Sequence, residues 1–162
     1  MSDVPPVFPD LPPYTYVPGF APHPVSHPDG HLRDFELPEG WSDSDHVKWG
    51  QRLFNGGYYW EAHEAWEHLW LSLGRTTEEA LAVKGLIKLA ASGVKCREGN
   101  AVGATRHALR SIELLESGSR SDLFDSCSLT VAKDVAKSIA KFPPVRFVEP
   151  SGKPVCLSLI HI

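Results

Sequence analysis

The chain has 162 residues, of which 42% are hydrophobic and 22% are charged, and its net charge at pH 7 is −4. These values are typical of one soluble globular domain with a substantial core. The three cysteines, Cys96, Cys127 and Cys156, are widely spaced without a Cys-x-x-Cys, which excludes a disulfide scaffold and a zinc ribbon.

No basic start followed by an apolar run marks a signal peptide. The longest apolar stretch, residues 81–94, is too short to span a bilayer and contains Lys84 and Lys88. We therefore expect a cytoplasmic protein with reduced thiols and no membrane contact.

The charge is uneven: residues 1–74 hold 11 acidic and 3 basic side chains, whereas residues 75–162 hold 9 acidic and 13 basic ones. Oppositely charged halves of one domain are expected to face each other. Arg106 and Arg110 make a basic ladder without interleaved aromatic residues, so nucleic acid is not a favoured partner.

Residues 1–43 form a predicted N-terminal arm. Ten of the fourteen prolines fall within residues 1–40, which excludes helix and predicts an extended coil. Tyr14, Tyr16, Phe20 and Phe35 are unusually apolar for a free tail, so part of the arm is expected to lie across the body of the protein.

Three arm histidines, His23, His27 and His31, recur every four residues, but the prolines between them forbid a helix that would align them. The favoured interpretation is solvated loop histidines; the alternative is that one of them reaches a site from the loop.

Residues 44–142 form a predicted all-α domain of about five helices built from antiparallel helical hairpins. Turn and cap signals divide this domain into helices, and they lie at Ser42, Asn55-Gly-Gly, Thr76-Thr77 and Gly99-Asn100. The expected helices cover residues 44–55, 58–73, 77–97, 101–117 and 128–142. Pro143-Pro144 ends the last one, and the tail, residues 143–162, is expected to be irregular or a short hairpin.

The stretch 54–70 carries three Trp, two Tyr, three Glu and two His, the densest set of such side chains in the chain. A helix there places Tyr59, Ala62, Trp66, Leu69, Trp70 and Leu73 on one apolar face. Trp60 and Leu71 point the other way, so we expect this helix to be covered on most sides.

Histidine and carboxylates share the other side of this helix, where His63 precedes Glu67 by one turn and Glu64 precedes His68. Such a set suits Zn, Mn or Fe, but the spacing matches neither HExxH, HxxEH nor the di-iron pattern. The favoured interpretation is a structural histidine hydrogen-bonded to Glu67, with the carboxylates paired; a metal or acid–base site is the alternative.

The third predicted helix is apolar almost all round except for Lys84, Lys88 and Lys95, which fall within a narrow strip. We expect this strip to meet the acidic face of residues 61–68; otherwise it is the solvent side of the helix. Gly85 and Gly93 leave room for another helix to come close.

Phe54-Asn-x-Gly-x-Tyr-Trp-Glu-Ala-His-Glu-x-Trp-Glu-x-x-Trp70 resembles the signature of the bacterial and archaeal domain-of-unknown-function family 309. Gly85-Leu-Ile-x-Leu-Ala-Ala and Gly99-Asn-x-x-Gly-Ala104 resemble its second and third blocks, and the resemblance covers about residues 44–117. It implies a small all-helical bundle with no established activity. Lys84 and Lys88 stand where the family's second block carries glutamines.

Two functions follow as hypotheses. The first is a binding or interaction module for a protein or small-molecule partner, with a polar pocket. The second is a metal-dependent enzyme, a hydrolase, using a divalent transition metal held by His63, Glu64 and Glu67 with His23 or His31. A homo-oligomer is expected if the arm leaves aromatic side chains uncovered. The candidate pocket residues are Asn55, Tyr59, Trp60, Glu61, His63, Glu64, Trp66, Glu67, Lys84 and Lys88.

Overall fold

The computed structural model describes residues 5–121, 123, 124, 126–144, 154 and 162. It is all-α, as predicted, and its described residues form no strand. The helices are α1 (Asp43–Asn55), α2 (Tyr59–Ser72), α3 (Glu78–Arg97), α4 (Ala101–Ser117) and α5 (Ser126–Lys141). The hairpin considered for the tail falls on residues outside this set.

Side-chain caps start the helices where the sequence indicates. Ser42 and Asp45 form a capping box, in which the Asp45 N–H donates to Ser42 Oγ at 3.2 Å and the Ser42 N–H donates to Asp45 Oδ2 at 2.9 Å. These hydrogen bonds from Ser42 lower the pKa of the Asp45 carboxyl. Thr77 and Asn100 cap α3 and α4 through one bond each, in which the side chain accepts the N–H of Ala80 and of Gly103 respectively.

Gly57 and Gly99 lie between paired helices, with φ of 87° and 76°. An L side chain rarely adopts this backbone, so glycine allows the chain to reverse within a few residues. The two turns create antiparallel hairpins, α1–α2 and α3–α4.

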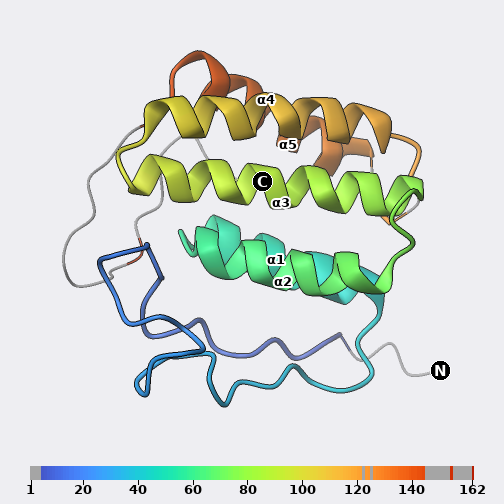
Figure 1. Cartoon of the computed structure of the whole chain (residues 1–162). Helices are drawn as coiled ribbons and strands as arrows, with labels where there is room; N and C mark the ends of the chain where they lie inside the picture. Colours follow the sequence, from blue (N-terminus) through green and yellow to red (C-terminus); the bar gives the residue numbers. More distant parts are fainter. Residues whose placement is uncertain (1–4, 122, 125, 145–153, 155–161) are drawn as a thin grey trace.

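Helix α3 lies at the centre, between α2 on one side and α4 on the other, and α5 packs on α4 (Figure 1). A Cβ added to Gly85 would lie 2.7 Å from Leu115 Cγ, and one added to Gly93 would lie 2.7 Å from Tyr59 Cγ. The two glycines therefore allow the close approach that was predicted. None of the described helices has the length and apolarity needed to cross a membrane.

The predicted apolar face of α2 is buried, with Tyr59, Ala62, Trp66 and Leu69 all in the core. The expectation that α2 is covered on most sides is only partly right, because Leu71 is 67% exposed. On this side of α2 the arm covers only the first turns of the helix, where Tyr16 packs against Trp60.

Residues 5–42 contain no helix and run as a coil below α1 and α2, on the side away from α4 (Figure 1). Aromatic side chains attach this arm. Phe8 and Phe35 each stack on Trp49, with ring centroids 6.2 and 6.5 Å away, and Tyr16 packs edge-on against Trp60 at 5.2 Å. The arm therefore forms one wall of the space between itself and helices α1 and α2.

Candidate functional site

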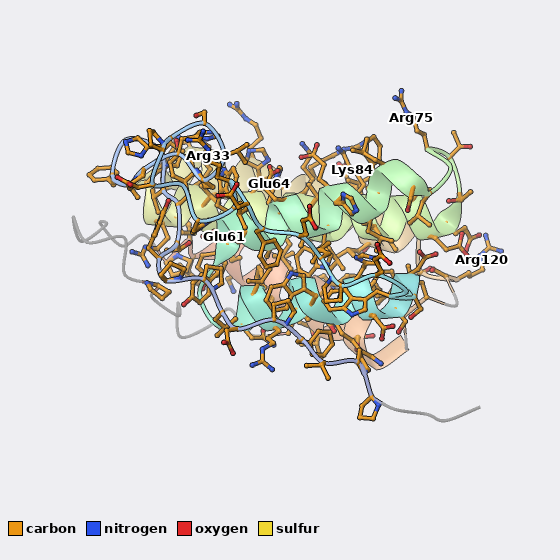
Figure 2. All side chains as sticks on the ribbon, turned by 90° about the horizontal axis from the view of Figure 1, so that it is seen from below. Arg33, Glu61, Glu64, Arg75, Lys84 and Arg120 are labelled. Atoms are coloured by element: carbon orange, nitrogen blue, oxygen red, sulfur yellow. The ribbon has the colours of Figure 1, made fainter. Side chains whose placement is uncertain are left out.

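Glu61 is a buried acidic side chain at the contact between α2 and the arm, and it is 2% exposed. It accepts hydrogen bonds from Thr15 Oγ1 at 3.2 Å, from the Tyr16 N–H at 2.9 Å and from His31 Nε2 at 3.1 Å. A buried carboxylate needs such donors to replace water. Glu61 thus holds two separate parts of the arm on α2. Figure 2 labels Glu61 and Glu64 among the side chains of this side of the molecule.

His31 of the arm is bonded to α2 through Glu61, and its side chain is only 1% exposed. Because Glu61 accepts the bond, Nε2 of His31 must carry the proton. Nδ1 is buried without a hydrogen-bond partner, while the ring packs against Tyr14 with centroids 4.3 Å apart. The interpretation of His31 as a solvated loop residue was wrong, since tertiary contact with Glu61 removes it from water.

His23 and His27 form hydrogen bonds in local turns of the arm, and the ring of His23 also packs edge-on against Trp60 of α2 at 6.0 Å. Nδ1 of His23 accepts the N–H groups of Val25 and Ser26, and Nδ1 of His27 accepts the N–H of Asp29. These bonds use the ring nitrogens within the arm itself.

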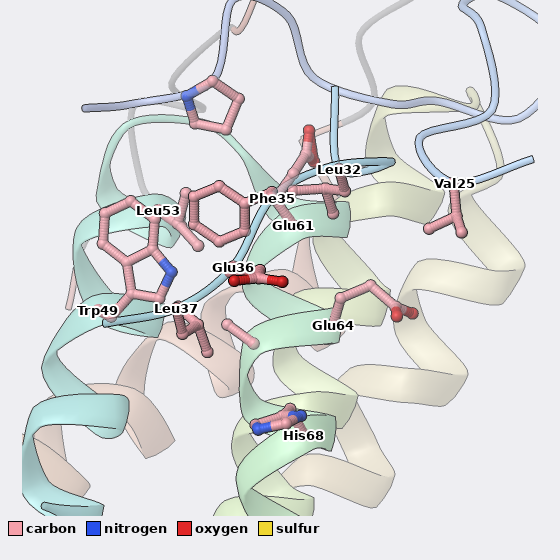
Figure 3. Close-up of a pocket in the computed structure, with 12 residues that line it drawn as sticks. Val25, Leu32, Phe35, Glu36, Leu37, Trp49, Leu53, Glu61, Glu64 and His68 are labelled. Atoms are coloured by element: carbon pink, nitrogen blue, oxygen red, sulfur yellow. The ribbon is translucent and has the colours of Figure 1, made fainter. Parts of the chain in front are cut away.

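A cavity of about 540 Å³ lies between the arm and helices α1 and α2 (Figure 3). This volume is in the range of sites for small organic molecules. Most of its walls are apolar, with Trp49 and Leu53 from α1 and Leu32, Phe35 and Leu37 from the arm.

The polar groups of the cavity are acidic or imidazole: Glu36 from the arm, and Glu61, Glu64 and His68 from α2. No lysine or arginine is among the described residues that line it. Glu61 is engaged by the arm, whereas Glu36 is exposed and forms no ion pair with another described residue. The cavity therefore favours a ligand with an apolar body and a positive charge.

His63, Glu64 and Glu67 form a second group on α2, with one ligand atom of each within 4.8 Å of the others. His63 Nδ1 lies 3.4 Å from Glu64 Oε1 and 3.7 Å from Glu67 Oε2. That nitrogen is buried yet makes no hydrogen bond with a described residue, and the Glu67 oxygen lies beyond hydrogen-bond distance. His23 and His31 do not join this group, so the expected ligand from the arm is absent from it.

The lysine strip of α3 lies beside α2, but it does not pair with the acidic face. Lys84 Nζ sits 4.1 Å from the ring centroid of Trp70, a cation–π contact, and Lys95 pairs with Glu98 at 2.6 Å. Within the described residues, no ion pair joins Lys84, Lys88 or Lys95 to Glu61, Glu64 or Glu67. The strip and α2 therefore lie side by side, as expected, but without an ion pair between them in this part of the structure, and Lys84 covers Trp70 instead.

His107 of α4 lies near the same strip. Burial lowers the pKa of His107, and the charges of Lys88, Lys95, His63 and Arg106 lower it further. This imidazole is therefore more readily neutral than a solvated one.

Of the ten predicted pocket residues, Glu61 and Glu64 line the cavity. Tyr59 and Trp66 belong to the core, where they are 1% and 0% exposed, and Trp60 packs against the arm.

The remaining predicted residues have other surroundings. Asn55 binds the backbone of Ile162, accepting its N–H at 2.7 Å and donating to its carbonyl oxygen. Lys84 covers Trp70, and Lys88 is half-buried near His107.

Trp49, Leu53, Phe35 and Glu36 line the cavity, although the sequence did not indicate them as site residues. Trp49 and Leu53 were recognised as positions of the first helix, and Phe35 as unusually apolar for a tail. His68, which belonged to the predicted set of histidines and carboxylates on the second helix, lines the cavity as well. The sequence predicted that the arm lies across the body, but not which arm residues face α1 and α2.

Cys96 is the one cysteine whose side chain lies in the described part of the chain. It is buried, and burial raises the pKa of its thiol to about 12, so this thiol is not a nucleophile at neutral pH.

Residues 47–107 match the model of a protein family described as Domain of unknown function (DUF309), which confirms the resemblance drawn from the signature. The match covers most of α1, all of α2 and α3, and the first part of α4. No curated protein matches the chain, and no solved structure matches it.

Proposed function

We propose that this chain, which carries a DUF309 domain over residues 47–107, is a helical binding module for a small organic cation. The single observation that carries the proposal is the cavity of about 540 Å³, with apolar walls and acidic polar groups. We place the module in the cytoplasm, because its cysteines show no disulfide pattern.

The chemistry of the walls supports a ligand with two different ends. Trp49, Leu53 and Phe35 offer an apolar surface, and burial of alkyl groups against it contributes roughly 0.8 kcal/mol per CH₂. Glu36 and Glu64 offer carboxylates to an ammonium or guanidinium group. An alkylamine or an amine-bearing side chain of a peptide has both features.

Calorimetric titration with octylamine, octanol and octanoate tests the proposal. We expect the amine to bind at least about tenfold more tightly than the alcohol, since a charge-assisted hydrogen bond contributes roughly 1.5–3 kcal/mol, and the carboxylate to bind most weakly. Equal binding of all three would contradict the assignment of a cation.

Substitutions inside and outside the cavity test whether the amine binds there. Ala65→Phe places a ring in the cavity and is expected to abolish amine binding, whereas Leu71→Phe, on the exposed side of the same helix, leaves it unchanged. Glu36→Gln is expected to weaken the amine but not the alcohol, with the neighbouring arm residue Glu39 changed to Gln as the matched control. Unaltered amine binding in Ala65→Phe would remove the cavity from consideration.

A second candidate function is a metal-dependent hydrolase centred on His63. The observation that favours it is the buried, unbonded Nδ1 of His63 beside two carboxylate oxygens. A divalent transition metal bound there would supply a water of lowered pKa.

Elemental analysis of untagged protein, purified without chelator, tests this candidate. A stoichiometric transition metal that is lost in His63→Ala supports it. Metal-free protein in which His63→Ala only lowers the melting temperature would make His63 a structural residue.

A further inference from the structure

A pair of histidines, one on α1 and one on α2, lies at the edge of the cavity, and one of the two, His68, is among the residues that line it. The rings of His46 on α1 and His68 on α2 have centroids 5.9 Å apart and planes inclined at 42°. Trp41 packs edge-on against His46 at 5.4 Å, on the arm side of the pair.

Neither imidazole has its nitrogens engaged by another part of the described chain, since no hydrogen bond or ion pair of His46 or His68 is found there. His46 is half-buried and His68 is exposed, so the pair is open to solvent on one side. Unengaged ring nitrogens on two adjoining helices are ready ligands for a metal ion.

The separation of the rings fits one ion between them. An imidazole nitrogen binds Zn²⁺ at about 2.0–2.1 Å, which places the ion roughly 3.2 Å from the ring centroid. Two rings around one ion are then about 5.2 Å apart in a tetrahedral arrangement and about 6.4 Å apart in a linear one. The observed 5.9 Å lies between these values, so binding needs side-chain rotation and no movement of the helices.

We propose that His46 and His68 together bind one divalent transition ion of the Zn²⁺, Ni²⁺ or Cu²⁺ type, with water completing its coordination. Imidazole donors suit these ions and not Mg²⁺ or Ca²⁺, which require oxygen ligands. The site is distinct from the His63 group, because His68 faces α1 and the cavity, whereas His63 shares its environment with His107 on α4.

Calorimetric titration of the untagged full chain with ZnCl₂ and NiCl₂ at pH 7.5 tests the proposal. The expected result is one equivalent bound by the parent, with affinity lowered at least about tenfold in both His46→Ala and His68→Ala, as loss of one of two protein ligands requires. His27→Ala, at an exposed arm histidine, is the matched control and keeps parent affinity.

His63→Ala separates this site from the other metal candidate. If the His63→Ala variant still binds one equivalent of metal, the result supports the histidine pair. If His63→Ala loses metal binding while His46→Ala keeps the affinity of the parent, the proposal is overturned. Absence of binding up to millimolar metal would also overturn it.

A second readout guards against misfolded variants. Saturating Zn²⁺ is expected to raise the melting temperature of the parent and of His63→Ala, because the ion links α1 to α2 in the folded state only. Zn²⁺ is expected to leave the melting temperatures of His46→Ala and His68→Ala unchanged. A cooperative melt of both variants without metal is expected as well, which shows that they fold. An equal rise in all variants would contradict the proposal.

Discussion

Glu61 is the residue on which the arm depends. Its two oxygens accept one hydroxyl, one backbone N–H and one imidazole N–H from two stretches of the arm that are far apart in sequence. Hydrogen bonds to a buried carboxylate are stronger than neutral ones, and loss of the acceptor strands the donors. Glu61 therefore holds the outer wall of the cavity together with the aromatic contacts on Trp49 and Trp60.

Glu61→Gln tests this role. The amide keeps the shape of the carboxylate, but one of its two acceptor oxygens becomes an NH₂ donor. The single oxygen that remains cannot accept from Tyr16, His31 and Thr15 together. We expect a loss of about 1–3 kcal/mol in the free energy of unfolding, measured by urea denaturation, and faster proteolysis of the arm.

The matched control is Glu67→Gln, on the same helix but half-exposed and away from the arm. It is expected to change stability by less than about 0.5 kcal/mol. Equal stability of Glu61→Gln and the parent would show that aromatic packing alone holds the arm.

At the scale of elements, the contact of α1 with α2 is set by Gly50 and Trp66. A Cβ at position 50 would lie 2.1 Å from Trp66 Nε1, and the indole is wholly buried and donates to the Val47 carbonyl oxygen at 3.2 Å. The ring cannot retreat without breaking that hydrogen bond. The glycine therefore sets how closely the two helices that carry His46 and His68 approach.

Gly50→Ala is expected to destabilise the protein by about 1–3 kcal/mol through overpacking. This outweighs the gain of about 1 kcal/mol that alanine brings to a helix interior. Urea denaturation measures the difference, with Lys48→Ala, exposed on the same helix, as a control near zero. A stabilised Gly50→Ala would mean that the helices move apart freely.

At the scale of the whole molecule, two helical hairpins and a fifth helix form the body, and the arm closes one side of it. The helices were predictable, because their 3.6-residue periodicity, their caps at Ser42, Thr77 and Asn100, and the turn glycines all lie in local sequence. Local signals of this kind depend little on the rest of the chain.

The candidate site was predictable only in part, for a physical reason. Glu61 and Glu64 were found because they belong to the dense stretch on α2. Glu36 and the burial of His31 were not, since they depend on where a proline-rich coil docks. Position along such a coil carries no periodic signal that identifies the side facing the protein.

The long sequence distance between Glu61 and its partners has a consequence for synthesis on the ribosome. Thr15 and Tyr16 precede Glu61 by 46 and 45 residues, so the nascent arm is made well before the helix that holds it. The α1–α2 hairpin forms from near neighbours and is expected to precede arm docking. Until then the tyrosines of the arm stay in water, where a chaperone can bind them, and the cavity has no outer wall.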